Sequence, residues 1–320
     1  MKGNTLKLNK HYSITETFAQ LVIQSVVIEA GEKNTPVSVA VVDYGGHLVA
    51  FRRMDGAYFA SAEAALGKGR SCAAFQSSTG QFSNMAKQEP WLGDLPGMVP
   101  LGGTAPLFMD GAFIGAVSVS GSTEEGEQAL ADGAAKRFPA LCAAFLEGDA
   151  PAGIEHVGIT VPDIDAAETF FHQAFNAVTL YALIDHDQPP SGGEAIHQMN
   201  GLNPGTAMSE VRMLRLGNGA NVELFSLTGY GRKEAAGIND MGLTHLGVYC
   251  ADIGAATARF ARAGGELLAG PNPLSGCEAG EGNAFRFGKT PWGMLVEFLH
   301  FPAPLAYNKG SQLKRWNPTL

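Results

Sequence analysis

Two histidines and two glutamates occupy matching places in the second half of the chain. His156 lies in IEHVGITV and His245 in LTHLGVYC, each on the strand face opposite an apolar row. Glu223 and Glu297 have apolar neighbours in NVELFSL and LVEFLHF. A carboxylate in an apolar strand needs a partner, because burying an unpaired charge is costly. Two imidazoles and two carboxylates are suitable ligands for a divalent metal such as Ni, Zn, Co, Fe or Mn.

An internal repeat relates these residues. Residues 154–171 and 243–260 align without gaps and share seven of eighteen positions, including the histidine. Each repeat therefore supplies an opening strand with a histidine, then a helix, then closing strands of which one carries the glutamate. Pseudo-twofold symmetry between the repeats predicts that the four side chains meet at one metal ion.

The chain length of 320 residues favours two domains. We place the boundary near residue 150, in the sequence GDAPAG. The prediction is a first domain at 1–150, a second, metal-binding domain at 151–302 and a polar C-terminal tail at 303–320.

The first domain has the pattern of an α+β fold with a mainly antiparallel sheet. Helices are expected at about 13–32 and 59–76, and strands at VSVAVVDYG and HLVAFRRM. Asp110–Gly111 is a strong hairpin signal between the strands PLFMDG and AFIGAVSVSG. A further helix is predicted to start at Ser122, where Ser122 and Glu125 match a capping box.

With these motifs in order, residues 152–301 resemble the glyoxalase/bleomycin-resistance/extradiol-dioxygenase superfamily, the vicinal oxygen chelate proteins. The resemblance implies paired βαβββ modules around one metal. The set His156, Glu223, His245 and Glu297 is similar to that of glyoxalase I, which implies a lyase or isomerase that acts on vicinal oxygens through a metal-bound enediolate. It also implies that Glu297 is the base that takes the proton and that Glu223 serves the other face.

Two alternatives remain open at this point. One is an extradiol-type Fe(II) ring-cleaving dioxygenase, in which two histidines and one glutamate bind iron and Glu223 is not a ligand. The other is sequestration of a small molecule, as in bleomycin-resistance proteins.

The substrate is not specified by the sequence. Arg212, Arg215 and Arg286 are candidates for binding glutathione carboxylates. Arginines in strands are, however, more commonly solvent-exposed residues without a binding role. Residues 185–206 are expected to form a loop or flap over a different, bulkier substrate. His186, with its aspartate neighbours in this segment, is interpreted as part of a solvated turn.

Residues 12–140 resemble the GlcG/HbpS-like family in VSVAVVDYGGHLVAFRRMDGA, in Lys68 and in VPLGGTAPLFMDGAFIGAVSVSG. The resemblance implies a homo-oligomer and, in some members, haem binding. His47 stands in a turn and is not transferred as a haem ligand, so haem is kept only as an alternative. The LGGTAP glycines and Ser122 could form an anion site, although turn and capping roles are favoured.

The formal charge of −9, from 22 basic and 31 acidic residues, gives no general attraction for nucleic acid or for anionic membranes. No apolar stretch approaches the ~20 residues of a membrane helix, and the N-terminus has no signal-peptide pattern. We therefore expect a cytoplasmic protein with a small-molecule substrate. The four cysteines form no CxxC pair and are expected to be free thiols.

Overall fold

The computed structural model describes residues 10–146, 153–229, 231, 233–307 and 315–318. The chain divides into two compact units, one of residues 1–150 with 307–315 and the other of residues 151–306 with 316–320. The predicted boundary near residue 150 lies outside the described residues. In the part of the chain that the structure describes, no helix is long and apolar enough to cross a membrane.

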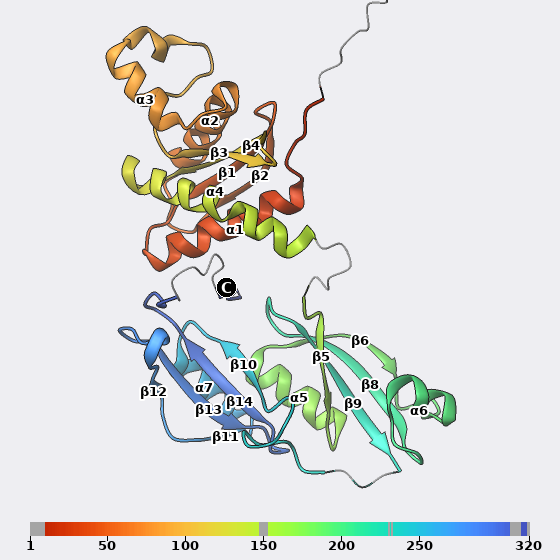
Figure 1. The fold of residues 1–320 in the computed structure, drawn as a ribbon. Coiled ribbons are helices and arrows are strands. Elements are labelled where there is room, and N and C mark those ends of the chain that lie inside the picture. Colours follow the sequence, from red (N-terminus) through yellow and green to blue (C-terminus); the bar gives the residue numbers. More distant parts are fainter. Residues whose placement is uncertain (1–9, 147–152, 230, 232, 308–314, 319–320) are drawn as a thin grey trace, which may run out of the picture. The chain divides into compact units, whose positions relative to one another are not determined.

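The N-terminal unit is a four-stranded antiparallel sheet with helices on both faces (Figure 1). Helices α1 and α4 cover one face and α2 the other, which confirms the α+β prediction. The strands run in the order β2-β1-β4-β3. The elements are α1 (Glu16–Glu32), β1 (Ser38–Asp43), β2 (Leu48–Arg53), α2 (Ala60–Phe75), α3 (Thr79–Gln88), η1 (Pro90–Asp94), β3 (Thr104–Met109), β4 (Ala112–Ser120) and α4 (Glu124–Leu146).

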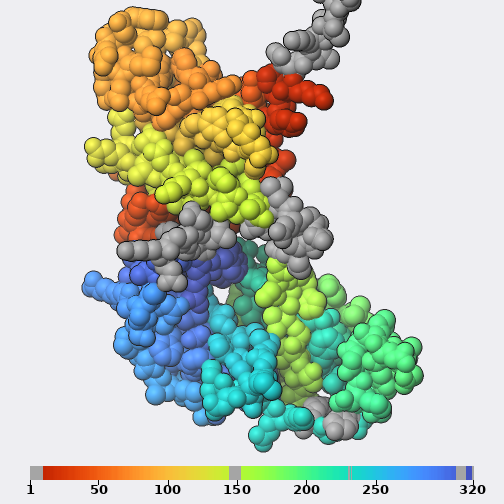
Figure 2. Space-filling model, in the orientation of Figure 1, coloured from red at the N-terminus to blue at the C-terminus, as the bar shows by residue number. Residues whose placement is uncertain are grey.

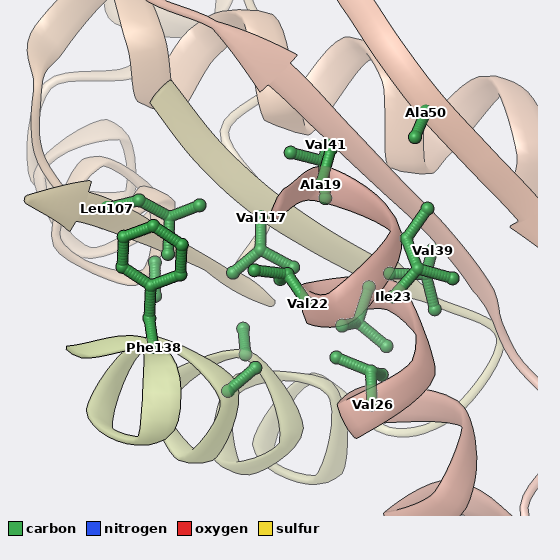
Figure 3. Packing of buried hydrophobic residues seen from close by; sticks show 14 of the residues in the cluster. Ala19, Val22, Ile23, Val26, Val39, Val41, Ala50, Leu107, Val117 and Phe138 are labelled. Atoms are coloured by element: carbon green, nitrogen blue, oxygen red, sulfur yellow. The ribbon is translucent and has the colours of Figure 1, made fainter. Parts of the chain in front are cut away.

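The main core of this unit lies between the sheet and the helix pair. Val39 and Val41 project from β1 toward α1, where Val22 and Val26 recur at helical spacing (Figure 3). All four of these valines are fully buried. The alternate residues of β1 face α2 instead, as Val42 does in a second small cluster with Cys72. The strand is buried on both faces, so its sequence is almost continuously apolar.

Of two local signals predicted in this unit, the hairpin agrees with the structure and the capping box does not. The Asp110–Gly111 hairpin is confirmed: both residues have positive φ, 49° and 78°, as a two-residue turn of this type requires. The predicted capping box at Ser122 is wrong, because α4 begins at Glu124. Thr123 Oγ1 accepts the Gly126 amide at 3.2 Å instead. The sequence offers two adjacent hydroxyl residues, Ser122 and Thr123, and local pattern alone does not decide between them.

The C-terminal unit contains two βαβββ modules, as the family resemblance implies. Their sheets have the equivalent orders β5-β9-β8-β6 and β10-β14-β13-β11, with the opening and closing strands parallel in each. The first module has β5 (His156–Thr160), α5 (Ile164–Phe175), β6 (Val178–Ile184), β7 (Ser191–Gly192), α6 (Glu194–Asn200), β8 (Ala207–Arg215) and β9 (Asn221–Thr228). The second has β10 (His245–Tyr249), α7 (Ile253–Arg262), β11 (Glu266–Leu267), β12 (Asn272–Pro273), η2 (Gly276–Glu278), β13 (Ala284–Lys289) and β14 (Leu295–His300).

Most residues shared by the two repeats are structural. Asp163 and Asp252 cap α5 and α7, each accepting the backbone N–H three residues later at 2.9 Å. The shared phenylalanines, Phe171 and Phe260, are fully buried in one core that spans both modules. Of the seven identities, the histidine and glycine of the opening strand are those that lie at the candidate site.

The equivalent caps give a matched stability prediction. Asp252→Ala removes the acceptor for the first turn of α7 and is expected to lower the free energy of unfolding by about 1 kcal/mol. Asp252→Asn keeps an acceptor and is expected to cost less. Urea unfolding of the three proteins measures the difference, and equal losses for alanine and asparagine would contradict the capping role.

The cysteines give a second prediction. Burial raises the pKa of Cys72, Cys142 and Cys250 to about 11, whereas Cys277 is exposed. Since the thiolate is the reactive form, a disulfide reagent at pH 8 is expected to label one thiol quickly in the native protein. Cys277→Ser should remove that fast phase. A fast phase that survives this substitution would show that a buried thiol is accessible.

Candidate functional site

Each module pairs its predicted histidine with its predicted glutamate. In the first module, His156 Nε2 lies 3.3 Å from Glu223 Oε2. In the second, His245 Nε2 lies 3.4 Å from Glu297 Oε2. The two histidine–glutamate pairs thus have nearly the same geometry on equivalent strands.

Strand register explains why the pairs match. Glu223 stands opposite Gly158, and Glu297 stands opposite Gly247. Each glycine lies two residues after the histidine of its strand and therefore on the same strand face. A Cβ on Gly158 would lie 3.2 Å from the Phe225 ring, a closer approach than side chains usually make. In the first module the shared glycine therefore leaves room for Phe225, whereas a Cβ on Gly247 would make an ordinary contact with Leu299 at 3.4 Å.

A third polar residue orients His156. Glu155 Oε2 lies 2.6 Å from His156 Nδ1, and Asn221 Nδ2 donates to Glu155 Oε1 at 2.6 Å. Because Nδ1 faces Glu155, the other ring nitrogen, Nε2, is the one that faces Glu223. The hydrogen bond with Glu155 raises the pKa of His156, partial burial opposes the rise and the charge of Glu223 adds to it.

The second module has a neutral counterpart to this contact. Thr244 Oγ1 lies 3.0 Å from His245 Nδ1 and occupies the position equivalent to Glu155. Neither Glu155 nor Thr244 was among the predicted site residues. The available signal was a polar residue immediately before each repeat histidine, in IEHVG and LTHLG, and such outer partners commonly orient metal-binding imidazoles.

The donor chemistry and the spacing within each pair fit a divalent metal. Ligand bonds of about 2.1 Å separate two ligand atoms by about 3.4 Å around a tetrahedral ion and about 3.0 Å around an octahedral one. The observed separations of 3.3 and 3.4 Å lie in this range. The two pairs remain apart, since no group of three or more His, Cys, Asp or Glu side chains in the described residues is arranged to hold an ion. The structure therefore contains two separate histidine–glutamate pairs, and a metal site shared by all four residues stays a prediction.

The surroundings of the two pairs differ in character. Met213 stands opposite Glu223 in the first module, and Phe287 stands opposite Glu297 in the second. The Phe287 and His245 rings meet edge to face, with centroids 5.4 Å apart. Phe285 continues the aromatic wall of the second module along the same strand face.

Two of the candidate arginines face away from these pairs. Arg212 and Arg286 stand opposite Leu224 and Phe298, both core residues, and so lie on the helix-covered side of their sheets. Arg212 is buried among the carboxylates of Asp165, Glu168 and Glu210, and Arg286 Nε donates to Leu268 O at 2.9 Å. Arg215 Nε donates to Gly217 O at 3.1 Å just beyond its strand. Arg212 and Arg286 thus have structural partners rather than a place on the pair-bearing face.

The segment 185–206 contains regular structure, so its prediction as a loop was incomplete. It forms β7 and α6, which lie in the green lobe of Figure 2. Its last residues line a cavity of about 580 Å³ at the ends of β5 and β9, with Thr160, Asn203 and Trp292 in its wall. His186 contacts Asp185 at 2.8 Å in an exposed turn.

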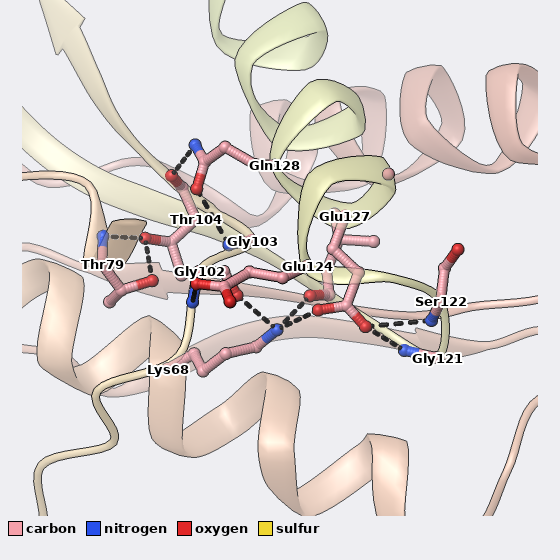
Figure 4. Close-up of polar contacts among 12 residues, drawn as sticks. Lys68, Thr79, Gly102, Gly103, Thr104, Gly121, Ser122, Glu124, Glu127 and Gln128 are labelled. Atoms are coloured by element: carbon pink, nitrogen blue, oxygen red, sulfur yellow. Dashed lines mark hydrogen bonds and ion pairs between the residues drawn. The ribbon is translucent and has the colours of Figure 1, made fainter. Parts of the chain in front are cut away.

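A buried polar network occupies the N-terminal unit. Lys68 is 1% exposed, and its Nζ donates to Gly102 O, Val119 O and Glu127 Oε2 at 2.8, 2.6 and 2.7 Å (Figure 4). Burial lowers the pKa of Lys68, and the hydrogen bond to Glu127 opposes this. In the sequence, Lys68 is recognisable only as part of a family motif, and its buried ion pair is not predicted.

The LGGTAP glycines serve the protein's own side chains. The amides of Gly102 and Gly103 donate to Glu124 Oε1 at 3.0 Å and to Gln128 Oε1 at 2.9 Å. The favoured turn role therefore holds, and the carboxylate of Glu124 already uses an amide that an anion would need. His47, the histidine considered for haem, lies in an exposed turn beside Asp43 at 3.3 Å.

The fold and the site define a two-unit protein whose second unit is built from paired βαβββ modules. Residues 14–136 match the family model "Haem degrading protein HbpS-like", and residues 155–283 match "Glyoxalase/Bleomycin resistance protein/Dioxygenase superfamily". The chain belongs to both families, one in each region.

Individual proteins are also similar to parts of this chain. The chain is similar to a 2-epi-5-epi-valiolone epimerase of Actinomyces sp, 30% identical over 168 residues, which are 52% of this chain and 88% of that protein. It is also similar to protein GlcG of Escherichia coli K12, 33% identical over 33% of this chain and 81% of that protein. Among solved structures, Klebsiella pneumoniae protein ORFY is 30% identical over 43% of this chain and 99% of that chain, with a TM-score of 0.42.

Proposed function

We propose that the C-terminal unit is a metal-dependent isomerase of a small molecule with vicinal oxygens, and that His156, Glu223, His245 and Glu297 hold one divalent ion. The observation that supports this most strongly is the repetition of the histidine–glutamate pair, at 3.3 and 3.4 Å, in the same register of both modules. Membership of the superfamily and the epimerase relative support the reaction class.

When bound, the ion would supply Lewis-acid stabilisation of negative charge on a substrate oxygen. The protein would supply the proton transfers. Glu297, as the carboxylate, takes a proton from the carbon beside a carbonyl, and Glu223, in its protonated form, returns one from the opposite side; exchange with solvent then restores both groups. Two equivalent carboxylates favour inversion at that carbon, and return of the proton to the neighbouring carbon gives the glyoxalase-type outcome. The Phe287 wall would position the apolar face of the substrate.

Proton exchange tests this function directly. The full-length protein is incubated in D2O with each divalent metal and a panel of α-hydroxyketones and hemithioacetals, and NMR follows deuterium incorporation beside the carbonyl while an electrode records O2. We expect metal-dependent exchange that is lost in Glu223→Ala. Substrate-dependent O2 consumption that survives Glu223→Ala would contradict the isomerase proposal and indicate a dioxygenase.

We also propose that the protein is a homo-oligomer. Strand β6 is an edge strand with exposed apolar side chains: Val178, Leu180 and Leu183 are 58%, 48% and 64% exposed. Edges of this kind favour pairing with another chain. Light scattering after size exclusion should give more than one copy, and Leu183→Lys should reduce the mass toward one chain. A monomeric wild type would contradict the proposal.

A further inference from the structure

A second pocket, of about 570 Å³, opens in the N-terminal unit where the start of α2, the end of β4 and the start of α4 meet. Its volume lies within the roughly 300–1,000 Å³ typical of small-molecule sites. The pocket belongs to the other unit of the chain from the histidine–glutamate pairs, so its ligand does not follow from the proposed isomerase function.

Hydroxyl groups dominate the polar part of its lining, and one of them lacks a partner. Ser120 lines the pocket and is 8% exposed; its Oγ makes no hydrogen bond with another described residue and is not fully buried, because it opens onto the pocket. Ser61, in the same wall, is 4% exposed and its Oγ donates to Tyr58 O at 2.6 Å. A hydroxyl that opens onto a pocket without a protein partner is available to donate to a ligand hydroxyl or to accept from one.

The charge of the lining excludes a strong preference for ions. Glu127 is its one charged side chain. Its Oε1 accepts the amides of Gly121 and Ser122 at 2.7 and 2.9 Å, and its Oε2 accepts Lys68 Nζ at 2.7 Å (Figure 4). The charge of the Glu127 carboxylate is therefore neutralised by Lys68, which is not a lining residue. Among the described residues that line the pocket, none is a cation that could attract an anion.

Small apolar surfaces complete the pocket. Ala60 and Ala64 contribute small apolar side chains to the lining. Tyr58, which is 75% exposed, contributes an aromatic side chain. Hydroxyls that both donate and accept, set beside an aromatic face and small apolar patches, match a molecule with O–H groups on one side and C–H groups on the other. We propose that this pocket binds a neutral polyhydroxylated molecule, a sugar or a cyclitol.

Binding to the full-length protein tests the proposal, with myo-inositol and glucose as neutral probes and inorganic phosphate as the anionic one. We expect saturable binding of a neutral probe by calorimetry, with shifts of the Gly121 and Ser122 amides in NMR spectra. Ser120→Val, which removes the hydroxyl and keeps the shape, should weaken it at least tenfold. Tyr58→Ala, at an exposed position, should also weaken it, whereas Ser77→Val, a matched change outside the pocket, should not.

Three results would overturn the proposal. They are absence of saturable binding of either neutral probe, binding that Ser120→Val leaves unchanged, and preferential binding of phosphate. Binding with unchanged Gly121 and Ser122 amides would place the probe elsewhere and would also refute it. None of these results bears on the metal content or proton exchange of the C-terminal unit, so the two proposals fail separately.

Discussion

Replacing Lys68 by methionine is expected to lower the stability of the N-terminal unit by about 3–5 kcal/mol. The substitution leaves the Glu127 carboxylate 7% exposed without its ammonium partner, and it removes the donor to two backbone carbonyls. Hydrogen exchange of the β1 and β4 amides in the full-length protein measures the loss within this unit.

Two variants separate the buried charge from a general effect of losing a lysine. Lys33→Met breaks an exposed ion pair with Glu29 and should cost less than about 1 kcal/mol. Adding Glu127→Gln to Lys68→Met removes the orphaned charge and keeps an acceptor for the Gly121 and Ser122 amides, so it should recover part of the loss. A Lys68→Met protein as stable as Lys33→Met would contradict the role of the pair.

Replacing Glu297 by glutamine is expected to slow proton exchange on the substrate by about 10²–10⁴-fold. Glutamine keeps an oxygen that can bind a metal and loses the basicity needed to take a proton, so metal content should change less than activity. The rate is measured by deuterium incorporation on whichever ketone the wild type accepts. The equivalent substitution, Glu223→Gln, should impair the return of the proton on the other face.

Glu266→Gln is the matched control, because this glutamate lies on the edge strand β11. It should exchange protons at the wild-type rate. If Glu297→Gln also kept that rate, Glu297 would not be the base.

Much of the fold could be predicted because most residues that recur in the repeat have structural roles. The residues that recur are those that cap a helix, as Asp163 does, or fill the shared core, as Phe171 does. Strand alternation also indicated His156 and Glu223 as candidate ligands from the opening and closing strands, although their contact at 3.3 Å within one module was not predicted. These features depend on short-range periodicity and on a symmetry that one sequence displays.

Other features depend on contacts between distant segments. Lys68 meets Gly102, Val119 and Glu127 across 34, 51 and 59 residues, and no local pattern announces those partners. The side of the sheet that Arg212 faces is set by its register with Leu224, which sequence inspection did not resolve. The hydroxyl pocket likewise combines residues from three elements, and no sequence motif in any one of them indicates a binding site.

The number of metal ions per chain tests the central claim most directly. After reconstitution with a divalent metal and removal of excess, elemental analysis should give one ion per chain in the wild type and near none in His156→Ala or in His245→Ala. His186→Ala removes an exposed histidine beside a carboxylate and should keep the ion. Two ions per wild-type chain, with each of the first two variants losing only one, would show independent half-sites and contradict a single shared metal.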